Sequence, residues 1–217
     1  HVRLLDESNL MQQEAVGILG VNLIYGAFNY YTDIERLIRS LGDNLEWGRL
    51  EIDLIRFTGP YFEDVDNRLM ALKLVEMELS DAVVFATDRK TLVHPSELFY
   101  NRELMIMRSM FKPVTNVSID MMNSGLEIFL RTVGVNVQRV MAVPEISIAE
   151  MRKLGSFDMQ DILDRVDCLN LLNYPVIVSN YLRFFRVRAY LGRYTKGKVA
   201  FVLGIPNLTT LFDADYY

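Results

Sequence analysis

The stretch "ELMIMRSMFKPVTNVSIDMMNSGLEIFLRTVG", residues 103–134, decides how the chain is interpreted. Its first part, 103–109, is an apolar run typical of a strand that is covered on both faces. A second parallel strand over 114–121 would leave a connection of only a few residues, whereas parallel neighbours need a crossover of about a dozen. We therefore predict a strand over 103–109 and a helix over 114–133.

The residues around this junction agree with a strand that turns into a helix. Pro113 prevents the strand from continuing, and Thr115 is suited to cap the helix. Gly134 follows as a stop signal. Apolar residues recur at helical spacing between these two signals: Ile119, Met122, Leu126, Phe129 and Val133.

The same alternation of apolar runs and helical patterns continues along the whole chain. Strand patterns cover 2–6, 51–57, 81–87, 103–109, 140–146, 175–180 and 199–205. Helical patterns cover 8–28, 32–42, 66–79, 95–100, 114–133, 158–172 and 181–194, and another begins at Asn207. Seven successive units predict an α/β fold with a parallel sheet, and we favour a TIM-like (β/α) barrel over an open doubly wound sheet. We expect one α/β domain, 1–217, that is part of a longer chain, because the sequence opens directly on a strand pattern.

Composition limits the classes of function. The chain has 217 residues, 51% apolar and 24% charged, which is enough for a full core, and its net charge of −5 makes nucleic acid an unlikely partner. Basic residues interleaved with aromatic ones between Arg183 and Lys198 leave that alternative open. A solvated outer helix face, or a contact with an acidic protein partner or another subunit, explains the same cluster.

Neither a membrane nor a metal is expected. The apolar run 15–28 is interrupted by Asn22 and is too short to span a bilayer comfortably. One cysteine, Cys168, excludes an internal disulfide and fits the cytoplasm. His1 and His94 lie far apart in sequence and match no zinc spacing, so we predict no metal site, with carboxylate-bound magnesium as an alternative that has no signature, and no cofactor is identified.

The carboxyl ends of the strands are where parallel α/β folds bind ligands. Arg108, Lys112 and Thr115 surround one such end, and the following helix offers free N–H groups, so we expect an anion site there. Arg56 and Asn180 lie at the carboxyl ends of other predicted strands and join the expected anion-binding set. The alternative is that Lys112 is solvated and that Arg108 pairs with a carboxylate such as Glu145.

Two carboxylates are candidates for acid–base chemistry. Glu145 ends an otherwise apolar strand, and burial there raises a carboxyl pKa. Asp53 alternates with Glu51 and is able to point into a barrel. For both residues, an ion pair within the sheet is the alternative interpretation.

The chain resembles an uncharacterised family of longer bacterial cytosolic proteins. The similar stretches are "GILGVNLIYG", "VDNRL", "PSELFY", "FKPVT", "DILDRVD" and "FDADYY". Members carry labels such as nicotinate-nucleotide adenylyltransferase or TonB-dependent receptor. The resemblance implies an interior piece of a longer protein and a junction closer to Arg-Gly-Ser-Phe-Arg-Pro-Val-Thr, from which Ser109, Met110 and Lys112 depart.

Two functions follow from these patterns. The first is a cytosolic enzyme or binding protein for an anionic small molecule that is phosphorylated, nucleotide-derived or a carboxylate. The second is a non-catalytic scaffold or assembly protein that uses a protein partner or forms a homo-oligomer. A concave strand-end mouth with a desolvated Glu145 would favour the first. A mouth filled by its own side chains, together with an apolar patch elsewhere, would favour the second.

Overall fold

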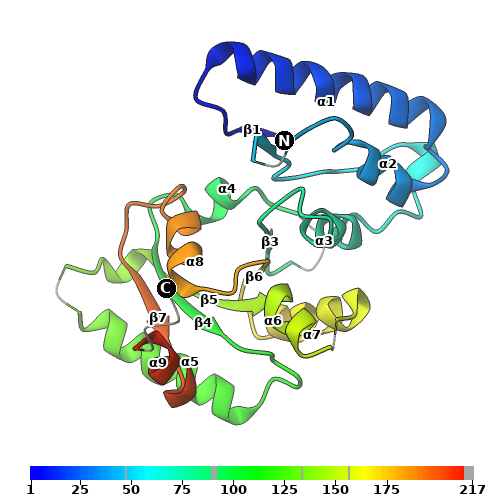
Figure 1. The fold of residues 1–217 in the computed structure, drawn as a ribbon. Helices are drawn as coiled ribbons and strands as arrows, with labels where there is room; N and C mark the ends of the chain where they lie inside the picture. Colours follow the sequence, from blue (N-terminus) through cyan, green and yellow to red (C-terminus); the bar gives the residue numbers. More distant parts are fainter. Residues whose placement is uncertain (47, 89–91, 133, 156, 213–217) are drawn as a thin grey trace. The chain divides into compact units, whose positions relative to one another are not determined.

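The computed structural model describes residues 1–46, 48–88, 92–132, 134–155 and 157–212. The protein is a mixed α/β chain that divides into two compact units, His1–Val83 and Val84–Tyr217 (Figure 1). We refer to them as unit 1 and unit 2.

Unit 1 combines a short β-ribbon with helices. β1 (Arg3–Leu4) pairs antiparallel with β2 (Leu50–Glu51). The helices are α1 (Asn9–Asn29), α2 (Ile34–Ser40), the 3-10 turn η1 (Pro60–Phe62) and α3 (Asn67–Glu76). The expectation that the runs 2–6 and 51–57 join one parallel sheet is therefore corrected. The physical reason is that the partners of this segment lie about 50 residues earlier: Glu51 and Asp53 are both buried, and Arg3 lies 3.8 Å from the first carboxylate and 3.6 Å from the second.

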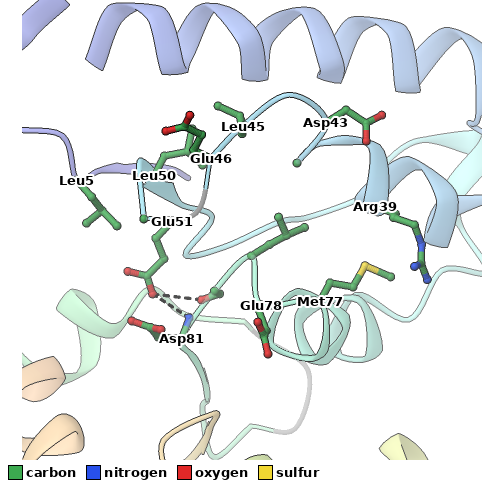
Figure 2. Close-up of a pocket in the computed structure, with 14 residues that line it drawn as sticks. Leu5, Arg39, Asp43, Leu45, Glu46, Leu50, Glu51, Met77, Glu78 and Asp81 are labelled. Carbon is green, nitrogen blue, oxygen red and sulfur yellow. Dashed lines mark hydrogen bonds between the residues drawn. The ribbon is translucent and has the colours of Figure 1, made fainter. Parts of the chain in front are cut away.

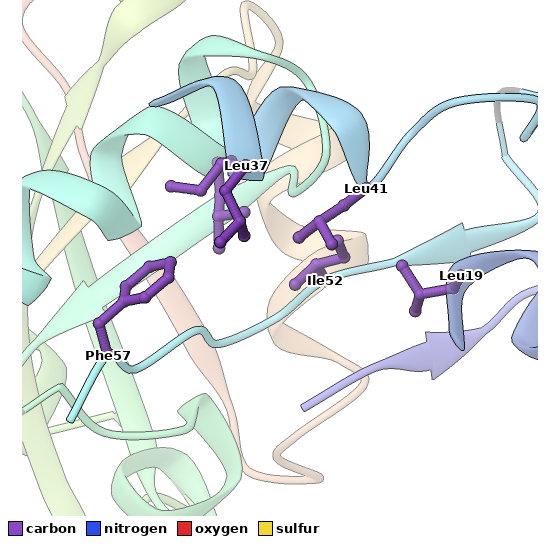
Figure 3. Packing of buried hydrophobic residues seen from close by; sticks show 7 residues of the cluster. Leu19, Leu37, Leu41, Ile52 and Phe57 are labelled. Carbon is purple, nitrogen blue, oxygen red and sulfur yellow. The ribbon is translucent and has the colours of Figure 1, made fainter. Parts of the chain in front are cut away.

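The core of unit 1 lies where α1, α2 and the segment after β2 meet. Leu19, Leu37, Leu41, Ile52 and Phe57 pack together there, with Ile38 and Leu74 completing the cluster (Figure 3). A glycine lets α1 approach α2 closely, because a Cβ at Gly26 would lie 2.9 Å from the Ser40 hydroxyl. The Asn22 amide then donates to the carbonyls of Leu41 and Asp43, which fixes α1 over the end of α2.

The main sheet has the strand order β3-β6-β5-β4-β7. Its members are β3 (Ala82–Phe85), which spans the unit boundary, β4 (Glu103–Arg108), β5 (Val140–Ser147), β6 (Val176–Ser179) and β7 (Val199–Val202). β4 pairs in parallel with both β5 and β7, and β5 pairs in parallel with β6. These five strands coincide with five of the seven predicted apolar runs.

Helices connect the strands of unit 2. They are α4 (Pro95–Phe99), α5 (Asn116–Leu130), the 3-10 turn η2 (Val137–Arg139), α6 (Ile148–Lys153), α7 (Met159–Leu171), α8 (Phe184–Leu191) and α9 (Ile205–Leu211). α5 lies against β4, β5 and β7, while α6 and α7 lie against β6. Within the described ranges, no helix is both long and apolar enough to cross a membrane.

The helix predicted from the opening stretch is confirmed as α5. Thr115 caps it, since its hydroxyl accepts from the Ser118 amide at 3.2 Å. Met122 and Phe129 are buried on its inner face, whereas Val133 lies outside the described residues. The chain also forms α6, which was not predicted. It begins directly at the end of β5, where the Ser147 hydroxyl accepts from the Glu150 amide.

Candidate functional site

Arg108 ends β4 directly beside Glu145 on β5, because the parallel register aligns these two residues. The guanidinium donates from Nε to one carboxylate oxygen at 3.0 Å and from Nη2 to the other at 2.8 Å. Arg108 is 4% exposed and Glu145 is fully buried. The structure therefore contains the ion pair between Arg108 and Glu145, which was the alternative to an anion site.

The remaining polar atoms of this pair also have partners. Arg108 Nη1 donates to the Glu150 carboxylate at 3.2 Å and to the Leu182 carbonyl at 2.7 Å. The Ser179 hydroxyl donates to Glu145 at 2.6 Å, and the Phe184 ring lies 4.6 Å from the guanidinium carbon. Burial opposes the charge of Arg108, but attraction to Glu145 and then to Glu150 outweighs it and raises the pKa of Arg108. The pair therefore acts as a buried structural junction between β4, β5 and β6.

Lys112 is neutralised in a similar way. Its exposed ammonium donates to Asp161 of α7 at 3.0 Å. Arg165 also donates to Asp161, and its other terminal nitrogen donates to the Met110 carbonyl at 2.9 Å. The loop that was predicted to hold an anion is thus anchored to α7 by a carboxylate shared between two cations.

The shared carboxylate makes the stability of the protein depend on pH. Hydrogen bonding from Arg165 outweighs burial, and together with Lys112 it holds the pKa of Asp161 below its ordinary value of 3.8. A lowered carboxyl pKa stabilises the fold fully above the ordinary value, and this stabilisation is lost as the pH falls through the lowered pKa.

We therefore expect Asp161→Asn to reduce the free energy of unfolding by about 1 kcal/mol near neutral pH. The difference from wild type should shrink towards zero in acid, as Asp161 becomes protonated in the wild-type protein. Urea unfolding followed by circular dichroism at several pH values measures it. Asp164→Asn, an exposed position on the same helix, is the control, and an equal loss in both variants at all pH values would contradict the pairing.

The other predicted site residues divide between the two units. Asn180 follows β6 in unit 2 and is half-buried. Arg56 and Asp53 belong to unit 1, where Arg56 is exposed. Asp53 is buried, with His1 Nδ1 at 3.1 Å and Arg3 Nη2 at 3.6 Å from its Oδ2. Asp53 therefore also forms ion pairs, which was the alternative to a role in acid–base chemistry.

Unit 1 also contains a pocket of about 450 Å³, which lies between the ribbon, the end of α2 and the segment after α3 (Figure 2). Such a volume falls within the usual range for small-molecule sites. Its lining residues are Leu5, Arg39, Gly42, Asp43, Leu45, Glu46, Gly48, Leu50, Glu51, Met77, Glu78, Leu79, Ser80 and Asp81. The lining thus combines an apolar part with five carboxylates and one guanidinium.

Glu51 is the fixed carboxylate of this pocket. It is buried, and its Oε1 accepts from the Asp81 amide at 3.1 Å and the Ser80 hydroxyl at 3.5 Å. Its other oxygen lies 3.8 Å from Arg3 Nε. Figure 2 shows the Glu51 and Asp81 side chains at one end of the pocket, with Asp43 and Arg39 at the other. Because Arg39 also lies 3.5 Å from Glu35, part of its charge is already compensated.

The acidic character extends through unit 1. Residues 1–83 carry 7 Lys and Arg against 15 Asp and Glu, a formal net charge of −8, whereas the remainder of the chain has a net charge of +3. A concave site in a unit of one charge sign concentrates ligands of the opposite sign. Electrostatics in this pocket therefore favour a cation.

Comparisons of the chain with protein families, with curated proteins and with solved structures found no match. The pocket was not predicted, since its lining comes from α2, from β2 and from the separate segments that follow β1, α2 and α3. One signal for it was present in the sequence, namely the excess of acidic residues before residue 83.

Proposed function

We propose that the protein binds a small organic cation in the pocket of unit 1. The observation that carries this proposal is the lining itself, where five carboxylates and one guanidinium surround an apolar interior. A ligand with an amine or guanidinium group on an apolar body matches both parts. Its charged end would lie near Glu51 and Asp81, and its apolar body against Leu45, Leu50 and Leu79.

Glu51 suits the role of an anchor for such a ligand. Its hydrogen bonds to the Asp81 amide and the Ser80 hydroxyl hold the carboxylate in place before any ligand arrives. A preorganised charge loses little conformational entropy on binding, which favours affinity. Charge-assisted hydrogen bonds from an ammonium group are also stronger than those between neutral groups.

A thermal-shift panel of spermidine, agmatine, tyramine and choline, with phosphate, citrate and ATP as anionic counterparts, tests the ligand class. A ligand at about 100 times its dissociation constant adds roughly 2.7 kcal/mol to the free energy of unfolding. For a chain of this size, we expect at least one amine to raise the unfolding temperature by roughly 5–10 °C.

The matched variants distinguish the pocket from general charge effects. Asp81→Asn combined with Glu46→Gln removes two charges from the lining and should abolish most of the shift. Glu63→Gln combined with Asp64→Asn removes two exposed charges from the same unit outside the lining and should leave the shift unchanged. Equal shifts in both double variants, or no shift with any amine, would refute the proposal.

The anionic ligand expected from the sequence stays a second prediction, and the same panel tests it. A shift with phosphate or ATP that disappears in Lys112→Ala would favour it, because Lys112 is exposed and its ion pair with Asp161 lies at the surface. Arg108 does not serve for this test, since its substitution leaves Glu145 buried without its cation.

The expectation of a barrel and the expectation of a longer bacterial protein also stay predictions. A (β/α) barrel would require its end strands to pair, and β3 and β7 are the end strands in the observed order. The likeness to longer bacterial proteins, the cytoplasmic location and any catalytic role for Glu145 or Asp53 are expectations of the same kind.

A further inference from the structure

Helix α1 carries a broad apolar surface on the side that faces away from its own core. Ala15, Leu19 and Gly26 are its buried residues, and they lie on one face at helical spacing. Five large side chains on the opposite side are 56–80% exposed: Leu10, Val21, Ile24, Tyr25 and Phe28. We call these five residues, together with Gly17 and Gly20, the outer α1 face.

The area of this face is large for an unoccupied surface. Aromatic side chains have roughly 200 Å² of surface each and aliphatic ones less, so the exposed fractions leave roughly 600 Å², most of it apolar. The largest apolar patch of a typical monomer covers about 300–600 Å², whereas a standard protein interface buries about 800 Å² on each partner. The outer α1 face therefore approaches the area that a stable dimer needs.

Among the residues that the structure describes, nothing packs against two glycines in the middle of α1. A Cβ at Gly17 or Gly20 would meet no atom within 4 Å, in contrast to Gly26, which faces Ser40 and Leu37. Each interior glycine costs a helix about 0.5–1 kcal/mol relative to alanine. Glycine does, however, permit the close approach of another backbone, and these two lie on the outer face near the helix midpoint.

The charge distribution restricts what covers this face. Glu14 is the single charged residue between Asn9 and Asn29, and Arg49 binds it at 2.9 Å. Glu14 is exposed and lies one turn after Leu10 on this same side, but Arg49 compensates its charge, so the face offers an oppositely charged partner little net charge to recognise. A helix that lies on anionic lipid needs Lys or Arg on its polar side, and α1 has neither.

We infer that the outer α1 face is a homodimer interface, in which α1 pairs antiparallel with α1 of a second copy. A two-fold interface uses the same patch on both subunits, so the patch has to be complementary to itself. Leu10 and Phe28 each lie nine residues from Leu19 along the chain, and Gly17 and Val21 each lie two residues from it. Antiparallel helices that cross at this level place Leu10 against Phe28 of the other copy, and Gly17 against Val21.

Light scattering coupled to size-exclusion chromatography tests the dimer over a wide range of protein concentrations. We expect a dimeric mass for the wild-type chain and a dissociation constant raised roughly 30-fold or more by Ile24→Glu, which buries a charge within the interface. Ile128→Glu, at a position 71% exposed on α5, is the matched control and should remain dimeric.

A second pair of substitutions distinguishes an interface from a helix that is only unstable. Gly17→Ala with Gly20→Ala should raise the unfolding temperature in the monomeric Ile24→Glu background, because alanine favours the helix. In the wild-type background, the same pair should weaken dimerisation, because the added methyl groups separate the two backbones.

Three results would overturn the inference. They are a monomeric mass for the wild-type chain at every concentration, a dimer that Ile24→Glu leaves intact, and a monomer that co-sediments with phosphatidylcholine or phosphatidylserine vesicles through Ile24. The last of these would assign the outer α1 face to a lipid surface.

Discussion

Glu145→Ala is expected to reduce the free energy of unfolding of the protein by roughly 3–5 kcal/mol, which is the usual cost of breaking a buried ion pair by removing one partner. The substitution leaves the Arg108 guanidinium at the end of β4 with its two shortest charge contacts gone. It also removes the acceptor of the Ser179 hydroxyl. Urea unfolding followed by circular dichroism measures the loss.

Removing both charges at once provides the decisive comparison. Arg108→Met combined with Glu145→Leu eliminates the unpaired charge, and apolar replacements of buried ion pairs are often neutral or stabilising. We therefore expect the double variant to recover most of the stability that Glu145→Ala loses. Glu150→Gln, which changes a partly exposed partner of Arg108, should cost less than about 1 kcal/mol. If Glu145→Ala also reduced the free energy of unfolding by less than about 1 kcal/mol, the structural role of the ion pair would be contradicted.

Gly197→Ala is expected to cost at least 2–3 kcal/mol, about the upper end of what an overpacked site usually loses. A Cβ at this position would lie 2.1 Å from the Arg102 carbonyl oxygen and 2.9 Å from the carbonyl carbon. Both are backbone atoms and are unable to rotate away. The same carbonyl accepts from the Thr195 hydroxyl at 2.6 Å, so a shift of the Arg102 backbone disrupts a second contact.

The damage should appear first in the pairing of β7 with β4. The Leu104 amide donates at 2.9 Å to the carbonyl of Lys198, which is the residue that follows Gly197. Hydrogen exchange should therefore become faster at Leu104 in the variant, and urea unfolding gives the total loss. Lys196→Ala, at the exposed neighbouring position, is the control and should change stability by less than about 0.5 kcal/mol. Equal behaviour of the two variants would contradict the close approach.

Local signals in the sequence predicted most elements of the structure. Thr115 and Asp158 were the expected starts of helices, and both act as caps, of α5 and α7 respectively. The runs over 103–109 and 140–146 became neighbouring parallel strands, as their continuous apolar character indicated. The caps and the apolar character of each run depend on residues that are close in the chain, so a single sequence contains them, whereas the register between the two strands depends on distant residues.

The partners of strands and of charges were harder to predict. Nothing local distinguishes the run 51–57 from a sheet strand, because its pairing with β1 depends on residues about 50 positions earlier. Arg108 shows the same limitation. Its position at a strand end suggested a ligand site, but the parallel register of β4 and β5 places Glu145 directly beside it. The pocket of unit 1 depends in the same way on segments that only the fold brings together.

The order of strands in the main sheet has a consequence for synthesis on the ribosome. β4, β5 and β6 are neighbours in the sheet and follow one another in the chain, so they can assemble as soon as they emerge. The other side of β4 is different, because its partner Val199 is made about 95 residues after Leu104. Translation proceeds at about 5–20 residues per second, and during that interval the apolar edge of β4 lacks its partner. An unpaired apolar edge is a template for aggregation, so the nascent chain is most vulnerable between the synthesis of β4 and that of β7.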